Sequence, residues 1–160
     1  MDLADLFRAS LATEAGNTSL AEELELVRRY LNIEDQRLAE RLRVEWDLQD
    51  LPSAARLPTL ILQPLVENAV YHGIEPAAGP GLVRIVGRYR RGMVNLSVRN
   101  TLPDPAAAGS GSARTGSHMA LDNVSQRMAA MFAGTALVSR SRVDGDYLVR
   151  LAFPYPWRQP

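Results

Sequence analysis

The stretch that decides the fold runs from Leu62 to Gly73 and reads LQPLVENAVYHG. Its apolar residues recur at helical spacing, which predicts a helix with one side in a core. Asn68 and His72 are four positions apart, so on a helix they project from one face, one turn apart. An amide oxygen and an imidazole on one face can hold a hydrated divalent cation and a phosphate oxygen. The alternative interpretation is a buried polar helix in an unrelated α/β domain. The specific order Glu-Asn-Ala-x-x-His-Gly in an apolar frame argues against that alternative.

This string resembles the N box of the GHKL, or Bergerat-fold, ATPases. It is most similar to the box of sensor histidine kinases of the AlgZ-like and LytS-like type, which partner LytTR-type response regulators. The resemblance implies that Asn68 binds the Mg²⁺ carried by ATP, that His72 lies at the phosphates, and that Gly73 belongs to the nucleotide-binding residues. Glu67 is a weaker catalytic candidate, which could polarise a water beside the phosphates or orient Asn68. The segment from Glu22 to Arg37 is also similar to the one that precedes this box in these kinases.

The two glycine-rich boxes of the family are eroded in this chain. In the first, Asn100 stands where the family has the aspartate that accepts a hydrogen bond from adenine, and both glycines are missing. An asparagine oxygen can still accept from an amine, without the charge that strengthens such a bond. In the second box only Gly116 remains; the resemblance places it at the phosphates, at the start of a helix. His118 is either a phosphate donor or a loop residue, and Arg127 reaches either the phosphates or solvent.

Composition excludes several classes of protein. The 160 residues suffice for one domain, or for one domain with a helical appendage. The 18 basic residues, all arginine, balance 18 acidic ones, so charge does not suggest a nucleic-acid partner. Cysteine is absent, which excludes disulfides and thiolate metal sites. No apolar run reaches the roughly 20 residues of a membrane span, so the chain is expected to be a cytoplasmic domain.

The order of elements predicts a two-layer α/β sandwich with an N-terminal helical segment. The resemblance implies that residues 1–42 are the end of a dimerisation or linker region and that residues 43–160 are the ATP-binding catalytic domain. A capping box, Ser19 with Glu22, starts a helix whose apolar positions continue to Leu42. Further helices are expected over residues 59–72, with Gly73 as the stop, and 120–132. Strands are expected over residues 44–48, 82–89, 93–99, 135–142 and 147–153, and a functional loop over residues 101–118.

The resemblance therefore predicts the ATP-binding catalytic domain of a two-component sensor histidine kinase. The parent reaction would move the γ-phosphoryl group of ATP, with Mg²⁺, to a histidine and then to an aspartate of a LytTR-type response regulator. The family's acceptor-histidine motif does not occur in this sequence. The chain is accordingly expected to be a fragment of an inner-membrane sensor that forms a homodimer at full length. The alternative is a degenerate GHKL domain that binds ATP weakly or not at all and acts as a regulatory interaction module.

Overall fold

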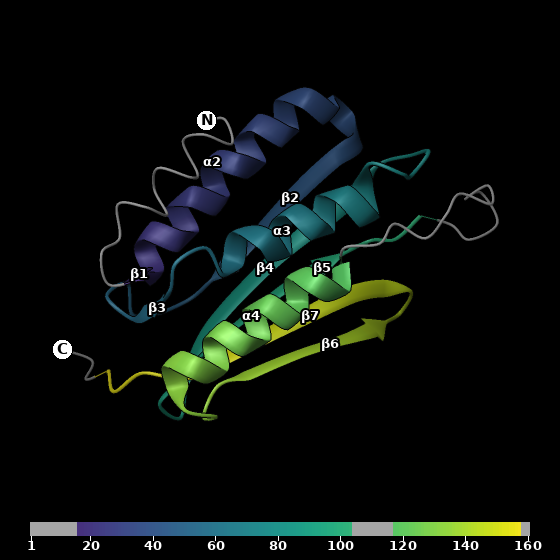
Figure 1. Cartoon of the computed structure of the whole chain (residues 1–160). Helices are drawn as coiled ribbons and strands as arrows, with labels where there is room; N and C mark the ends of the chain where they lie inside the picture. The colour runs from purple at the N-terminus through teal and green to yellow at the C-terminus, as the bar shows by residue number, and fades with distance from the viewer. Residues whose placement is uncertain (1–15, 104–116, 158–160) are drawn as a thin grey trace.

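The computed structural model describes residues 16–103 and 117–157, apart from the side chains of Ser117 and His118. A mixed five-stranded sheet forms one layer, and three helices form a second layer on one of its faces (Figure 1). This confirms the predicted two-layer α/β sandwich. The helices are α2 (Leu20–Leu38), α3 (Leu62–Ala69) and α4 (Ser117–Phe132). The strands of the sheet are β2 (Leu42–Leu48), β4 (Gly81–Arg90), β5 (Met93–Asn100), β6 (Leu137–Val143) and β7 (Asp146–Pro154).

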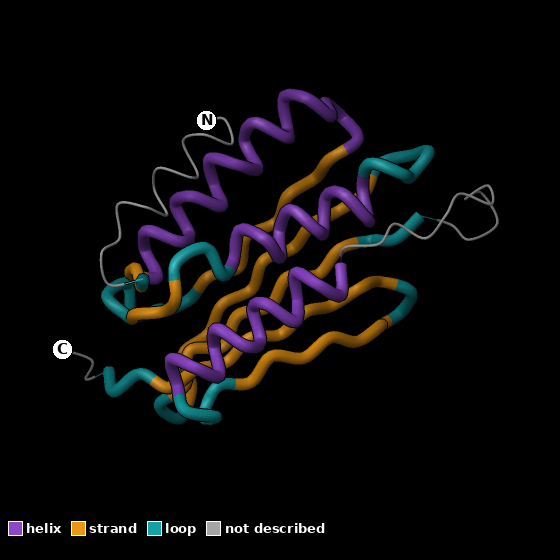
Figure 2. Tube along the Cα trace, in the orientation of Figure 1, coloured by secondary structure: helices purple, strands orange, loops and turns teal. Residues whose placement is uncertain are grey.

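The strands lie in the order β2-β4-β5-β7-β6, and only the β2–β4 pair is parallel. Side chains alternate between the two faces of each strand, as pleating requires. Toward the helices, β5 directs Val94, Leu96 and Val98, each at most 3% exposed. The other face carries mostly charged and small polar side chains, and none of the three helices covers it (Figure 2).

Helix α2 begins as the sequence predicts and ends earlier. The backbone amide of Glu22 donates to the Ser19 hydroxyl at 3.2 Å, which caps the first turn. At Ala39 the backbone turns to a φ of 52°, which no α-helix accommodates, and a 3-10 turn, η1 (Ala39–Arg41), follows. Leu42 is thus the first residue of β2, and its placement on the helix was wrong.

Helix α2 belongs to the same core as the sheet. Its apolar side chains Leu20, Val27 and Leu31 are at most 2% exposed and share one cluster with the buried residues of α3, β4 and β5. In the described part of residues 1–42, packing is therefore continuous with the rest of the domain. The proposed division at residue 42 stays a prediction about family organisation.

One small sheet escaped prediction from the sequence. Strands β1 (Asn17–Ser19) and β3 (Arg56–Pro58) pair antiparallel, directly before α2 and shortly before α3. Three residues are too few for an alternating pattern to stand out. This pairing brings the starts of α2 and α3 together, which matters for the site described next.

Candidate nucleotide site

Helix α3 and the segment directly after it carry the candidate polar residues outside the fully buried positions. Leu62, Val66, Ala69 and Val70 are at most 3% exposed, as their spacing predicts. Glu67, Asn68 and His72 are only partly buried. The Asn68 amide makes no hydrogen bond with any residue that the structure describes, so its oxygen can serve a ligand. The ring of His72 meets that of Tyr71 edge to face, with centroids 4.9 Å apart.

The end of this helix departs from the prediction. After Ala69 the chain widens into a π-helical segment, η2 (Val70–Ile74), so Gly73 lies inside a helical segment and does not stop it. Gly73 is needed here for close packing. A Cβ on this residue would fall 2.5 Å from the carbonyl oxygen of Thr101 and would collide with the side-chain amide of Asn100. The glycine thus lets the helix lie directly on the end of β5.

A Gly73→Ala substitution should therefore lower the free energy of unfolding by about 1–3 kcal/mol, the usual range for overpacking. The cause is steric, since the neighbouring atoms include backbone that cannot move aside. Urea denaturation of the two proteins measures the difference. Gly79→Ala is the matched control, because a Cβ there meets nothing within 4 Å. Equal stability of the two variants would contradict the packing explanation.

Asn100 ends β5 with its side chain buried at 2% exposure beneath η2. Its Nδ2 donates to the carbonyl oxygen of Thr101 at 3.0 Å. This bond orients the amide and leaves its oxygen as an acceptor. The structure therefore brings Asn100 against Gly73, which directly follows His72 in η2. Its predicted contact with adenine stays a prediction.

Replacing Asn100 with aspartate should destabilise the fold by about 1–3 kcal/mol. The carboxylate cannot donate, so one of its oxygens would face the Thr101 carbonyl in a buried site. A charge-assisted bond to adenine could offset this loss only when nucleotide is present. Thermal melts without and with Mg-ATP separate the two effects. Asn95→Asp, at an exposed position on the other face of β5, is the control and should melt like the parent.

The start of α3 is held by a buried carboxylate from α2. Glu23 is 0% exposed, and its oxygens accept from the backbone amides of Leu60 at 2.6 Å and of Ile61 and Leu62 at 3.1 Å each. Those of Ile61 and Leu62 are among the amides that a helix start leaves unpaired. Burial raises the pKa of Glu23, while the amide bonds and the charge of Arg127 act to lower it. In the sequence, Glu23 looks like any acidic residue of a first turn, so its role gave no separate signal.

Arg127, on α4, is part of the same junction. Its guanidinium donates to the carbonyl of Leu60 at 3.2 Å and to that of Thr59. These contacts tie α4 to the segment that leads into α3. They place the guanidinium at the opposite end of α3 from His72 and Gly73. Binding of phosphate by Arg127 stays a prediction, and in this structure its bonds are to backbone.

The far end of the α3–η2 segment is held by arginines that the sequence did not single out. Arg41 of η1 donates to the carbonyls of Ile74 at 3.1 Å, Glu75 at 2.8 Å and Ala77 at 2.9 Å. Arg37 pairs with the side chain of Glu75. Cations at a helix C-terminus satisfy its free carbonyls and its dipole. Together with Glu23, these residues brace the site helix at both ends from α2 and η1.

Glu67 is engaged on the side of α3 that faces α2. It accepts from Nε2 of Gln63 at 3.1 Å, one turn before it. It also lies near Tyr30 of α2, whose pKa is raised first by burial and then by nearby carboxylates that include Glu67. Its suggested catalytic role stays a prediction.

The remaining predicted residues lie at the edge of what the structure describes. Gly116 and most of the loop over residues 101–118 fall outside the described residues. His118 belongs to the first turn of α4, and its side chain is outside the described part. The chain between Pro103 and Ser117 connects β5 to α4.

Two further findings on the described residues concern metal binding and membrane insertion. Within residues 16–103 and 117–157, no group of three or more His, Asp or Glu side chains is arranged to hold a metal ion. Across the same ranges, no helix combines the length and apolar character that crossing a membrane requires.

Sequence comparison finds sensor kinases. A family model described as histidine kinase matches residues 1–42. The sensor histidine kinase BtsS of Escherichia coli (strain K12) is 30% identical over 158 residues, which cover 98% of this chain and 27% of BtsS. The sensor protein LytS of Enterococcus faecalis (strain ATCC 700802 / V583) is 26% identical over 164 residues, covering 96% of this chain and 28% of LytS. The chain thus spans little more than a quarter of these relatives.

Solved structures show the same fold. The catalytic domain of histidine kinase ThkA superposes with a TM-score of 0.60 at 14% identity, covering 86% of this chain and 93% of that one. ThkA in complex with the response regulator protein TrrA gives a TM-score of 0.58 at 15% identity, covering 95% and 47%. At such identity the likeness concerns the fold alone. The fold and the sequence relatives agree with the N box over residues 62–73, and the chain belongs to the GHKL sensor histidine kinases of the LytS-like type.

Proposed function

We propose that this domain binds Mg-ATP where α3 and η2 meet the end of β5 and the start of α4. The observation that carries the proposal is the placement of Asn68 on the outward side of a helix packed through Gly73 onto Asn100. Asn68 and His72 are partly exposed, and Asn100 is buried beneath η2, so the groups proposed for a metal, a phosphate and a base belong to one packed unit. The contacts of Glu23 and Arg41 hold the two ends of this helical segment in place.

The residues present fit magnesium that arrives with a nucleotide. Mg²⁺ prefers oxygen ligands and usually keeps several waters, bound through few protein groups plus substrate phosphates. The oxygen of Asn68 supplies one such ligand, and the described residues offer no acidic cluster that would hold the ion alone. Bound Mg-ATP supplies the transferable γ-phosphoryl group.

The chain's own residues would bind and position the nucleotide. Asn68 orients the metal, His72 donates to a phosphate oxygen, and the oxygen of Asn100 accepts from the adenine amine. Gly116 and His118 would add donors at the start of α4, where free backbone amides favour an anion. Phosphoryl transfer depends mainly on such positioning and on electrostatic stabilisation.

Titration with a fluorescent ATP analogue, with and without Mg²⁺, tests the proposal. We expect saturable binding that weakens when EDTA removes the metal and that unlabelled ATP reverses. Binding that is absent at millimolar nucleotide would instead support the second candidate, a regulatory interaction module without nucleotide. The eroded glycine boxes are the observation that keeps this candidate, since only Gly116 remains of the second box.

The phosphate acceptor is proposed to be a histidine outside this sequence. His72 belongs to η2 and His118 to the first turn of α4, both beside the proposed nucleotide. A side chain that contacts the phosphates cannot also attack in line opposite the leaving oxygen. The parent protein is proposed to be an inner-membrane homodimer that passes the phosphoryl group to a LytTR-type response regulator.

The isolated 160-residue chain should therefore not label itself with radioactive γ-phosphate, although it binds ATP. Adding the segment that precedes the N-box region in the parent, in cis or on a second chain, should give acid-labile label on a histidine of that segment. Acid-labile label on the isolated chain that disappears in His72→Gln or His118→Gln would refute this assignment. Gel autoradiography after acid and base treatment provides the measurement.

A further inference from the structure

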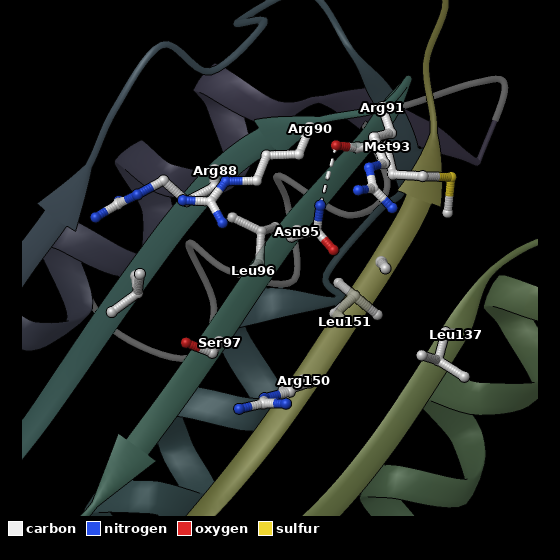
Figure 3. Close-up of a pocket in the computed structure, with 12 residues that line it drawn as sticks. Arg88, Arg90, Arg91, Met93, Asn95, Leu96, Ser97, Leu137, Arg150 and Leu151 are labelled. Carbon is white, nitrogen blue, oxygen red and sulfur yellow. Dashed lines mark hydrogen bonds between the residues drawn. The ribbon is translucent and has the colours of Figure 1, made fainter.

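The face of the sheet opposite the helices carries a hollow of about 620 Å³ that the nucleotide proposal does not use. It lies over β4, β5 and β7, with β6 at its margin (Figure 3). Asn68 and Asn100 belong to the helix-covered side, so the hollow is separate from the candidate nucleotide site. Its volume lies within the range of ligand sites, which is about 300–1,000 Å³.

The charged side chains that line the hollow all have one sign. Arg88, Arg90, Arg91 and Arg150 line it, and no acidic residue does. Arg88 is neutralised by Asp47, with Nη2 2.8 Å from Oδ2. The other three are exposed and make no ion pair with any residue that the structure describes.

The acidic residues of this face are engaged elsewhere. On one side of the hollow, Arg84 pairs with Asp47 at 3.3 Å. On the other, Arg99 pairs with Asp146 at 2.8 Å. The hollow between these pairs thus keeps uncompensated positive charge on a chain whose net charge is zero. Such a site attracts anions.

The cations are too far apart for one small anion. Arg150 of β7 lies opposite Ser97 of β5. Arg90 of β4 lies opposite Met93, which is the first residue of β5. Four residues of strand separate these positions, about 14 Å at 3.4 Å per residue. Figure 3 shows Arg150 at one end of the hollow and Arg90 and Arg91 at the other. A single phosphate or carboxylate cannot reach both ends, whereas an extended chain with two anions can.

The surface between the cations is aliphatic. Val86, Met93 and Ala152 contribute to the lining, and Leu137 at the margin is 59% exposed. The lining contains no aromatic side chain on which a nucleic-acid base could stack, which disfavours single-stranded nucleic acid. Because the surface is concave, a flat membrane would reach its rim but not its aliphatic floor.

From this charge pattern, spacing and lining, we infer that the open face of the sheet docks an extended acidic peptide segment of a partner protein. A segment of the form Glu-x-Leu-x-Glu fits, because alternate residues of an extended chain point to one side. Its two glutamates are four residues apart, about 14 Å along the chain, matching Arg150 at one end and Arg90 with Arg91 at the other. The central leucine then covers the aliphatic floor.

The probe is a fluorescein-labelled peptide, Gly-Thr-Glu-Thr-Leu-Thr-Glu-Thr-Gly. The control peptide carries the same label and has both glutamates replaced by glutamine. Fluorescence anisotropy at low salt should show saturable binding of the first and at least tenfold weaker binding of the second. Affinity should fall as salt rises, since the contacts are exposed ion pairs. No saturable binding below about 1 mM, or equal affinity for both peptides, would overturn the inference.

Charge reversal locates the site. Arg150→Glu and Arg91→Glu should each weaken peptide binding at least tenfold, while Arg150→Lys should retain most of it. Arg43→Glu is the matched control, because Arg43 is an exposed arginine of β2 that does not line the hollow. Circular dichroism confirms that each variant is folded. If Arg43→Glu weakens binding as much as the others, the effect is general charge and the inference fails.

Two competing ligands and the nucleotide complete the test. An oligo-dT strand, or vesicles with 30% phosphatidylserine, should bind more weakly than the peptide and should not depend on Arg150 and Arg91. Stronger binding of either, lost in both variants, would replace the peptide by that ligand and overturn the inference. Mg-ATP should not displace the peptide, and the peptide result stands whether or not the domain binds ATP.

Discussion

Replacing Asn68 with alanine should weaken Mg-ATP binding about a hundredfold, equal to roughly 2.8 kcal/mol at about 1.4 kcal/mol per factor of ten. The substitution removes the only described side chain proposed to contact the metal. It should not unfold the domain, because Asn68 is partly exposed and alanine favours helix more than asparagine does. Isothermal titration with ATP at saturating Mg²⁺, alongside a thermal melt, measures both effects.

Asn32→Ala supplies the matched control for this experiment. Asn32 is an exposed asparagine inside α2, so the same chemical change is made in a helix away from the proposed site. Its affinity should equal that of the parent. A folded Asn68→Ala protein that binds Mg-ATP like the parent would remove the central residue of the proposed site.

Replacing Glu23 with alanine should lower the free energy of unfolding by about 3–5 kcal/mol, as the loss of one partner in a buried charged network does. Three backbone amides at the start of α3 would lose their acceptor, and two of these bonds are fully buried. The guanidinium of Arg127 would also lose its nearby counter-charge. Since a domain is stable by only about 5–15 kcal/mol, this is a large share.

Urea denaturation gives the measurement, and Glu25→Ala gives the control. Glu25 lies two residues further along α2 and pairs with Arg29 at 3.1 Å on an exposed surface. Exposed pairs of this kind contribute little, so the control should lose less than about 1 kcal/mol. Similar losses in the two variants would mean that the carboxylate of Glu23 does not brace α3. Glu23→Gln should fall between, because its amide keeps one oxygen to accept.

Where periodic patterns were long, the sequence predicted the fold well. Alternation over residues 82–89 and 93–99 matches β4 and β5 to within a residue at each end, because one face is buried and the other exposed. The strands expected over residues 135–142 and 147–153 do form the last hairpin, which turns at Asp144 and Gly145. In the site helix, the spacing identified which residues face the core, since burial alone dictates that pattern.

Contacts between distant segments could not be predicted in this way. Glu23 and the amides it caps are 37 to 39 positions apart, and Arg41 is 33 to 36 positions from its carbonyls. Nothing local distinguishes a buried carboxylate in a first turn from an exposed one. The widening of the helix after Ala69 likewise leaves no mark in the pattern, because Val70 and Ile74 are buried in either geometry.

That wider turn, η2, holds one residue more than an α-helical turn does over the same span, as the bond from the Glu75 amide to the Val70 carbonyl shows. Deleting Tyr71, which is 47% exposed, would remove little packing. The shortened turn can then close to α-helical geometry, so His72 stays on the side of Asn68 and Gly73 still meets Asn100. A deletion within Leu62–Ala69 would instead turn every later side chain by about 100° around the axis. Changes of length should therefore be tolerated in homologous proteins at this turn and not in the helix before it.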